Sequence, residues 1–189
     1  MSVVTLFNYF KRPKSCLPLI NVLHQIKTGK YRRKIEQLRK YYDEDLGSEY
    51  DAQKRVIPRF SVSANFRLVD EQLKVVSYSG NLLLEIPYLN ERDMKAVKML
   101  LANDPYVMAF FENALGNGLV FIVRSDGKIA EHQQLFTKAL KYYQFLTGIN
   151  RISTLGQRIE HTCMVSLDEH VYLRLDAAPF SSRSKFIEG

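Results

Sequence analysis

The apolar positions in the second half of the chain form short runs of strand length and longer runs with helical spacing. A short apolar run is typical of a buried strand, whereas apolar residues three and four positions apart are typical of a helix. Asn90 is a favourable helix cap and Gly148 a favourable helix end. In chain order, the pattern predicts a strand at Leu82 to Ile86, a helix from Asn90 to the Asp104-Pro105 pair, strands at Tyr106 to Phe111 and Leu119 to Val123, a helix from Ile129 to Thr147 and a strand at Thr162 to Ser166.

This succession is the β-α-β-β-α-β order of ferredoxin-like and RNA-recognition folds, so we expect an α+β domain. In front of it, Ser2 to Phe10 is apolar and β-rich and predicts an additional strand. Two helices should follow, one capped by Ser15 and ending near Ile26, and one from Tyr31 to Tyr42. The expected architecture is a β-α-β-β-α-β core with an N-terminal strand and a two-helix extension. This order occurs with many functions, so it predicts the fold and not the activity.

The remaining segments are assigned from their turn residues and charges. Asp43 to Asp51 is polar and acidic and predicts a loop, and Arg59 to Arg67 alternates as a single strand does. Gly116-Asn117-Gly118 predicts a hairpin turn and not a phosphate-binding loop, because no helix is expected to begin there. We expect one domain over residues 1–180 and a short polar tail over residues 181–189.

The apolar faces of the predicted elements should pack into one shared core. The expected members are Leu83, Ile86, Val97, Leu101, Val107, Phe121, Val123, Leu140 and Val165.

Composition narrows the class of protein. Apolar residues make up 46% and charged residues 25% of the 189 residues, which is typical of a globular domain. No apolar run reaches the ~18 residues of a membrane-spanning helix, and the N-terminus does not resemble a secretory signal. Cys16 and Cys163 are far apart and outside any CxxC pair, which favours a reducing compartment and disfavours a metal site. We therefore expect a cytoplasmic protein without contact to a membrane.

Positive charge is concentrated in the predicted second helix. The formal net charge is +7, and the stretch from Lys27 to Lys40 contains Glu36 as its only acid. A dense cationic stripe attracts phosphate backbones without reading sequence, although a solvated helix face has the same composition. The acidic stretch from Asp43 to Asp51 could also neutralise the stripe. The expected nucleic-acid-binding residues are Lys30, Arg32, Arg33, Arg39 and Lys40.

Catalytic patterns are scarce in this sequence. The four histidines are too scattered to predict a zinc site by their spacing. Nucleotidyl transfer requires two or three carboxylates that converge on metal ions, yet the strand from Leu82 to Ile86 offers only Glu85. The next position on the same side is Pro87, which has no ligand atom. We therefore expect no catalytic residue, with Glu85 the single residual candidate, and no cofactor or metal.

Several segments, taken in order and spacing, resemble a known family. They are FNYF, YSGNLLLEIPYL, ANDPYVMAF, GNGL, HQQLFTKALKYY and MVSLDEHVYLRLDAAPF. With these landmarks the chain is similar, over about Val3 to Phe180, to the N-terminal domain of bacterial VirE-type proteins, a branch of the archaeo-eukaryotic primase superfamily. The resemblance implies a primase-like fold, a mobile genetic element as the context and a replication or mobilisation protein as a partner.

The same resemblance argues against primase activity. Active members carry an Asp-x-Asp pair at the end of the first core strand, a Ser and a Lys or His around the GNG turn, and two Asp and an Arg after the long helix. The corresponding positions are Glu85 and Pro87, Leu115 and Val120, and Ser153, Arg158 and His161. One Glu beside a proline cannot hold a metal pair, so the resemblance implies a degenerate member.

Three functions remain in competition. The first is a catalytically inactive module that binds DNA, RNA or a replication partner. The second is a metal-dependent nucleotidyltransferase with an altered site, in which Asp168 or Asp176 would join Glu85. The third is a pure protein-interaction domain, in which the charge serves solubility.

Overall fold

A computed structural model of the chain describes residues 2–8 and 12–181. The end of the predicted first strand, Tyr9 and Phe10, and nearly all of the predicted polar tail lie outside these residues. The strands are β1 (Val3–Phe7), β2 (Pro13–Pro18), β3 (Arg59–Ser61), β4 (Ala64–Val69), β5 (Gln72–Tyr78), β6 (Leu82–Ile86), β7 (Val107–Glu112), β8 (Leu119–Val123), β9 (Thr162–Met164) and β10 (Tyr172–Leu173). The helices are α1 (Leu19–Lys27), α2 (Arg32–Asp43), α3 (Gly47–Val56), α4 (Glu91–Asn103) and α5 (His132–Thr147), with 3-10 turns at Ile129–Glu131 and Leu155–Gln157.

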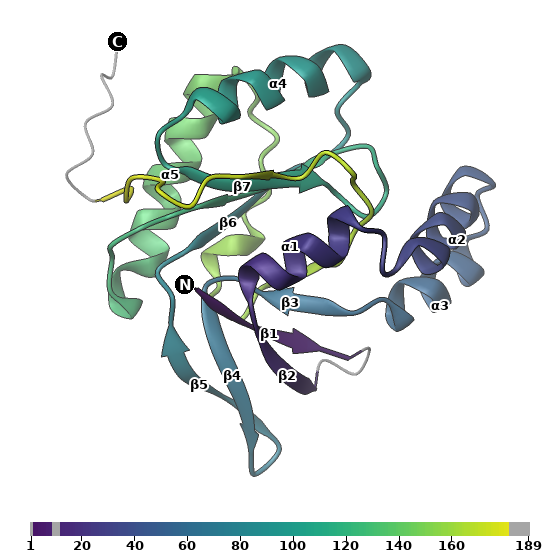
Figure 1. The fold of residues 1–189 in the computed structure, drawn as a ribbon, viewed down its shortest axis with the longest axis horizontal. Helices are drawn as coiled ribbons and strands as arrows, with labels where there is room; N and C mark the ends of the chain where they lie inside the picture. Colours follow the sequence, from purple (N-terminus) through teal and green to yellow (C-terminus); the bar gives the residue numbers. More distant parts are fainter. Residues whose placement is uncertain (1, 9–11, 182–189) are drawn as a thin grey trace.

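The expected α+β class is confirmed, and the elements form layers around a central antiparallel sheet of order β10-β7-β8-β6 (Figure 1). Helices α4 and α5 cover one face of this sheet, where Leu101 and Phe136 share a cluster with Phe121 of β8. Helix α1 and a second sheet, β2-β1-β3-β9, cover the other face. There, the ring of Phe60 lies 6.3 Å from that of Phe111. Both faces of the central sheet are therefore buried.

The last strand of the predicted β-α-β-β-α-β unit has an unexpected partner. Residues Thr162–Met164 are extended, but β9 pairs with β3 of the second sheet, and β10 pairs with β7 of the central sheet instead. The chain first follows the edge of β6, where the backbone N of Ser153 donates to the carbonyl oxygen of Glu85 at 2.8 Å. It then turns away at Gly156, where a Cβ would lie 2.1 Å from the Leu83 carbonyl oxygen. The close approach requires glycine there.

The first helix begins later than expected. Ser15 does not cap it but lies in β2, paired with Leu6 of β1, and α1 starts at Leu19. The reason is Pro18, because a proline disfavours helical conformation in the residue before it. The predicted second helix is present as α2, with Ile35 and Leu38 fully buried on its inner side.

Two further expectations are wrong in detail. Helix α3 covers the end of the segment that was predicted as an acidic loop, Asp43 to Asp51, and continues to Val56. It buries no residue and therefore shows no apolar periodicity. It is held on α2 partly by the Gln53 side chain, which donates to the Lys34 carbonyl oxygen at 2.8 Å. The single strand predicted for residues 59–67 is two strands, broken at Val62, whose carbonyl oxygen accepts a hydrogen bond from Ser79 Oγ. After the break, β4 forms a hairpin with β5.

The predicted core is divided between two clusters. Leu83 and Val165 pack with α1 and the second sheet, whereas the other predicted members pack with α4 and α5. Successive side chains of a strand point to opposite faces. Leu83 and Glu85 therefore face the second sheet, while Ile86 faces the helices. Among the described residues, no helix has the length and apolar character needed to cross a membrane.

Candidate functional site

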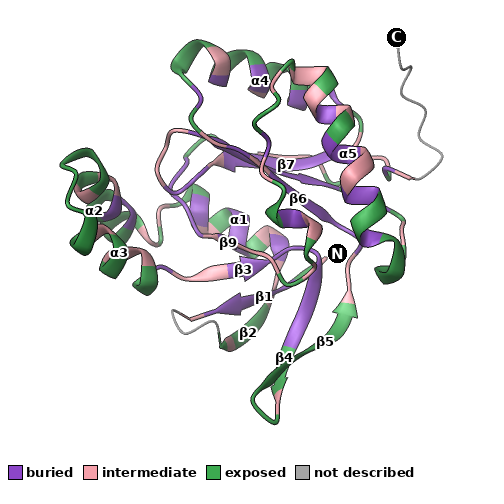
Figure 2. Cartoon of the chain, turned by 180° about the vertical axis from the view of Figure 1, so that it is seen from behind, coloured by how far each residue is buried: buried purple, intermediate pink, exposed green. Residues whose placement is uncertain are grey.

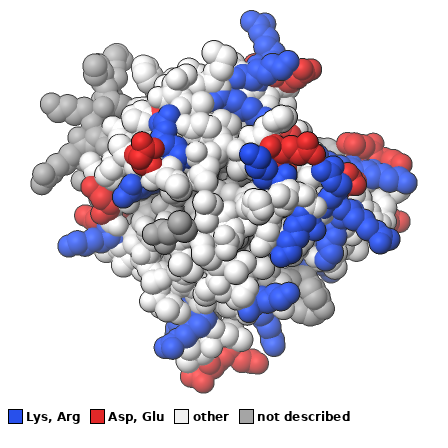
Figure 3. Space-filling view, viewed as in Figure 1, with Lys and Arg blue, Asp and Glu red and all other residues white. Residues whose placement is uncertain are grey.

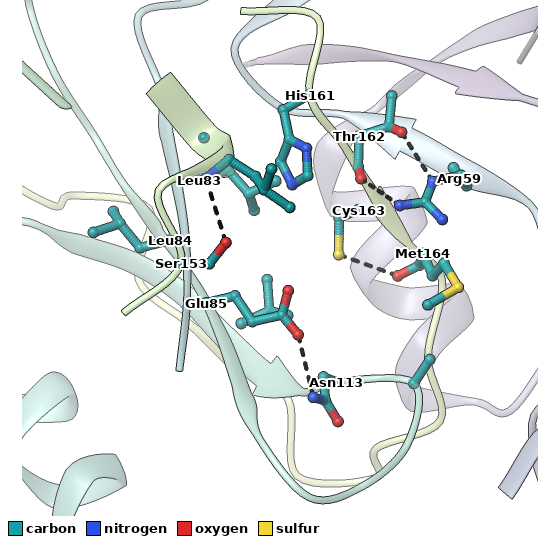
Figure 4. Close-up of a pocket in the computed structure, with 14 residues that line it drawn as sticks. Arg59, Leu83, Leu84, Glu85, Asn113, Ser153, His161, Thr162, Cys163 and Met164 are labelled. Atoms are coloured by element: carbon teal, nitrogen blue, oxygen red, sulfur yellow. Dashed lines mark hydrogen bonds between the residues drawn. The ribbon is translucent and has the colours of Figure 1, made fainter. Parts of the chain in front are cut away.

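A cavity of about 100 Å³ lies between the central and the second sheet (Figure 4). Glu85 of β6 enters it from one side, and Thr162 and Cys163 of β9 enter it from the other. Its lining residues come from five separate parts of the chain: Arg59; Leu83, Leu84 and Glu85; Asn113, Ala114 and Val120; Ser153, Leu155 and Gly156; and His161, Thr162, Cys163 and Met164.

Glu85 lies at one end of this cavity. The amide Nδ2 of Asn113 donates to its Oε1 at 3.2 Å. Burial raises the pKa of Glu85, and this hydrogen bond and the charge of Arg59 offset the rise only in part. The other amide atom, Asn113 Oδ1, is buried and has no hydrogen-bond partner among the described residues. The cavity thus holds a carboxyl group in a poorly solvated setting.

His161 and Arg59 lie at the opposite side of the cavity. Burial, together with the nearby charges of Arg59 and Arg158, lowers the pKa of His161 to about 4. The imidazole is therefore neutral at physiological pH. The guanidinium of Arg59 donates to the Thr162 hydroxyl and to the Thr162 carbonyl oxygen, both at 3.0 Å (Figure 4). Arg59 is thereby fixed against β9.

A wider outer cleft of about 340 Å³ continues from this cavity. The two spaces share Arg59, Leu155, His161 and Thr162 in their walls. The outer cleft adds Arg158 and Glu160 on one side, and Leu73 of β5 on the hairpin side. It is therefore a mixed surface, with apolar side chains from Phe7 and Leu73 and charged ones from Arg158 and Glu160.

The structure brings together several of the positions that the family resemblance matched to active-site residues. Glu85, Val120, Ser153 and His161 line the inner cavity, and Arg158 lines the outer cleft. Sequence reasoning missed Arg59, Asn113 and Cys163, because they lie in three distant segments with no shared pattern. Burial raises the pKa of the Cys163 thiol, so this cysteine is not activated as a nucleophile.

The carboxylates that an altered nucleotidyltransferase would recruit lie elsewhere. Asp168 accepts hydrogen bonds from the backbone N of Glu112 and His170, and neither Asp168 nor Asp176 lines the cavity. Within residues 2–8 and 12–181, no group of three or more His, Cys, Asp or Glu is arranged to hold a metal ion.

The residues of the predicted cationic stripe on α2 differ in their exposure and in their contacts. Lys30, Arg33 and Lys40 are exposed. Arg32 is exposed too, but its guanidinium lies 2.8 Å from a carboxylate oxygen of Glu169 and 3.5 Å from one of Glu36. Lys40 pairs loosely with Glu44 at 3.9 Å. In Figure 3, basic side chains gather on the side of the molecule that carries α2 and α3, with acidic ones among them.

Arg39, one of the expected nucleic-acid-binding residues, is turned toward the protein and not toward solvent. Its Nε donates to the Ala114 carbonyl oxygen at 3.0 Å, and its Nη2 donates to the Leu167 carbonyl oxygen at 3.1 Å. The guanidinium also lies against Gly116 of the β7–β8 turn, where φ is +75°. Arg39 therefore attaches α2 to the central sheet. The GNG segment itself is the predicted turn, closed by Asn113 N donating to the Gly118 carbonyl oxygen.

Comparison with protein families gives one match, the BT4734-like, N-terminal domain, over residues 51–173. The chain belongs to this family. The matched segment contains the cavity residues from Arg59 to Met164, and the cationic stripe on α2 precedes it. Membership in the BT4734-like family therefore carries no argument about α2. A search of curated proteins and a search of solved structures each gave no match.

This match corrects the expected family. The chain was predicted to be a degenerate VirE-type, primase-like domain, but the BT4734-like family is a distinct one. The assignment to VirE-type proteins and to the primase superfamily is therefore wrong. The mobile-element context and the replication or mobilisation partner followed from that assignment alone, and no finding supports them.

Proposed function

We propose that this BT4734-like domain binds the phosphate backbone of a nucleic acid through the exposed cations at the end of α1 and along α2. The observation that carries the proposal is the exposure of three cations: Lys30 in the turn between α1 and α2, and Arg33 and Lys40 on α2. Arg33 and Lys40 are seven positions apart, which places them on one side of the helix. Lys27, at the end of α1, is exposed next to them in the chain.

The contacts on the inner side of α2 support the view that these cations face solvent. Ile35 and Leu38 are fully buried, and Arg39 is held by the backbone carbonyl oxygens of Ala114 and Leu167. The helix is therefore fixed in rotation, so its exposed cations form a preorganised surface. Binding to such a surface loses less conformational entropy than binding to a mobile segment.

The central sheet cannot serve as the binding surface in the manner of an RNA-recognition domain. Such domains stack bases on aromatic side chains of an open sheet face. Here Phe111, an aromatic side chain on the face that lies against α1 and the second sheet, is 0% exposed, because these elements cover that face (Figure 2). Contact with a nucleic acid would therefore use the helices and rely on charge, with little reading of sequence.

Acidic side chains weaken the stripe without cancelling it. Glu36, Glu44 and Glu169 lie beside Arg32 and Lys40, whereas no ion pair involving Lys30 or Arg33 is formed among the described residues. The acidic stretch after α2 contributes Glu44 alone to these pairs, and its Asp51 pairs with Lys54 within α3. Lys30 and Arg33 are therefore the cations most available to phosphates.

The experiment compares two variants of equal charge by fluorescence anisotropy with single-stranded and duplex oligonucleotides. Lys30→Ala/Arg33→Ala removes two cations from the stripe, and Arg92→Ala/Lys141→Ala removes two exposed cations from α4 and α5. We expect the first variant to lose most of the affinity and the second to retain it. Equal loss in both variants would indicate attraction by net charge, and absence of binding by the wild type would refute the proposed function.

A further inference from the structure

The hairpin of β4 and β5 projects from the body of the protein (Figures 1 and 2). Its base is anchored: the Tyr78 hydroxyl lies 2.9 Å from His132 Nδ1, and the ring of Phe66 lies 6.0 Å from that of Phe7. Asn65 Nδ2 also donates to the Ser77 hydroxyl at 2.9 Å. The base of the hairpin is therefore attached to the body of the protein.

One edge of this hairpin has no partner. Among the described residues, β5 pairs with β4 alone, and six of its seven residues are exposed. An unpaired edge presents a row of backbone N–H and C=O groups that can pair with another strand. Natural edges are usually blunted by proline, a bulge or several charges. The segment from Leu73 to Tyr78 contains no proline and Lys74 as its single charge, and its register shifts once, between the pairs Asn65–Ser77 and Phe66–Val75. The regular part of the edge is therefore the outer one, from Gln72 to Val75.

The two faces of the hairpin differ in chemistry. Leu68 lies opposite Leu73, and Phe66 lies opposite Val75, so one face is apolar. Leu68, Leu73 and Val75 are 42%, 36% and 39% exposed. Leu73 also lines the outer cleft, together with Phe7. The apolar face therefore continues into a concave surface that can receive side chains.

The other face carries a pair of like charges. Arg67 lies directly opposite Lys74, and like charges in this arrangement are destabilising. Lys74 Nζ donates to Gln72 Oε1 at 2.7 Å, and neither cation forms an ion pair among the described residues. A second copy of the chain at this edge would add two more cations to the same face. An acidic group would relieve the repulsion.

We propose that the free edge of β5 binds an extended segment of a partner protein in which apolar and acidic residues alternate. Backbone hydrogen bonds would add this segment as a further strand, which is an established mode of peptide recognition. Its apolar residues would lie beside Leu73 and Val75 and reach the outer cleft. Its acidic residues would lie beside Lys74, with Arg67 one strand further on the same face. The inference is independent of the proposed binding of nucleic acid by α2.

The test uses the full chain and a blocked peptide of alternating valine and glutamate, equal in length to the seven residues of β5. A peptide of alternating valine and lysine is the control. Amide hydrogen exchange followed by NMR should show about tenfold slower exchange in β5 with the acidic peptide and no change with the basic one. In Arg67→Glu/Lys74→Glu this preference should reverse, because both cross-strand cations become acidic.

Several outcomes would overturn the inference. They are unchanged exchange in β5 with the acidic peptide, equal protection by both peptides, and a preference that the charge reversal leaves unaltered. Protection that rises with protein concentration alone would identify a second copy as the occupant, and stronger protection by an oligonucleotide would identify a nucleic acid. Leu73→Ser should weaken peptide binding, whereas Leu100→Ser, at a leucine of similar exposure on α4, should not.

Discussion

Asn113 donates a hydrogen bond from Nδ2 to Glu85 Oε1 at 3.2 Å, while its own Oδ1 is buried without a partner among the described residues. The amide is thus oriented toward the carboxyl group, and the orphaned oxygen costs stability. The pair joins the β7–β8 turn to β6 at one end of the inner cavity. It identifies Glu85 as a carboxyl group held in an unfavourable setting.

Replacing Glu85 by glutamine should stabilise the protein at neutral pH. The pKa of Glu85 is raised by burial, so the folded state binds its proton more tightly than the unfolded state does. Folding therefore loses stability as the pH rises through the range between the ordinary and the raised pKa. The increase in melting temperature that Glu85→Gln causes relative to the wild type should be larger at pH 7.5 than at pH 4. Glu91→Gln is the control, because the Glu91 pKa is lowered by Lys95 and no such gain is expected.

His161 should make the fold sensitive to mild acid. Its pKa is about 4 in the folded protein, mainly through burial, and about 6.5 in an unfolded chain. Between these values the unfolded state binds more protons, so stability should fall as the pH decreases from 6.5 to 4. Chemical denaturation at several pH values should show a shallower decline for His161→Gln than for the wild type. An NMR titration that placed the His161 pKa near 6.5 would contradict the described burial.

Adjacent leucines on α4 provide a matched test of the helix packing. Leu101 is 0% exposed and lies in the cluster with α5, whereas Leu100 is 38% exposed. Leu101→Ala should lower the free energy of unfolding by about 2–5 kcal/mol. Leu100→Ala should change it by about 0.5 kcal/mol or less. Equal effects in urea denaturation would show that the inner face of α4 is wrongly assigned.

Substitutions at two arginines of α2 should distinguish an effect on stability from an effect on nucleic-acid binding. Arg39→Ala removes two hydrogen bonds to the carbonyl oxygens of Ala114 and Leu167 and should cost about 1–3 kcal/mol of stability. Arg33→Ala should leave the melting temperature nearly unchanged, because Arg33 is exposed, and should weaken binding to nucleic acid. Thermal unfolding and anisotropy measured on the same two variants would check this. A stable Arg39→Ala protein would mean that α2 does not depend on that contact.

The sequence predicted correctly those elements whose hydrophobic pattern or cap depends on their own residues alone. The β8 strand from Leu119 to Val123 and the cap of α4 were predicted correctly, and the Asn90 side chain accepts from Asp93 N as a cap does. A short apolar run and a helix cap are local features, so they can be recognised without knowledge of the neighbouring elements. The α+β class followed from the order of such elements.

The sequence could not predict features that depend on distant partners. Helix α3 buries no residue, and six of the seven residues of β5 are exposed, so neither element has a buried apolar face. Strand β9 pairs with β3 because the chain turns away from β6 at Gly156. Glycine is needed there because the backbone of a distant residue, Leu83, lies close by. The cavity combines Arg59, Asn113 and Cys163, which no spacing rule connects. The position of Arg39 was missed because helical spacing cannot show that a long side chain reaches back to the sheet.

The most direct test of the central claim is the slope of log affinity against log salt concentration for duplex DNA. Each phosphate that a cation neutralises contributes about 0.9 to the slope. If Lys30 and Arg33 each contact a phosphate, the wild type should bind with a steep slope, and Lys30→Ala/Arg33→Ala should reduce it by close to two units. A wild-type affinity independent of salt, or an identical slope for wild type and variant, would contradict the assignment of α2 as the phosphate-binding surface.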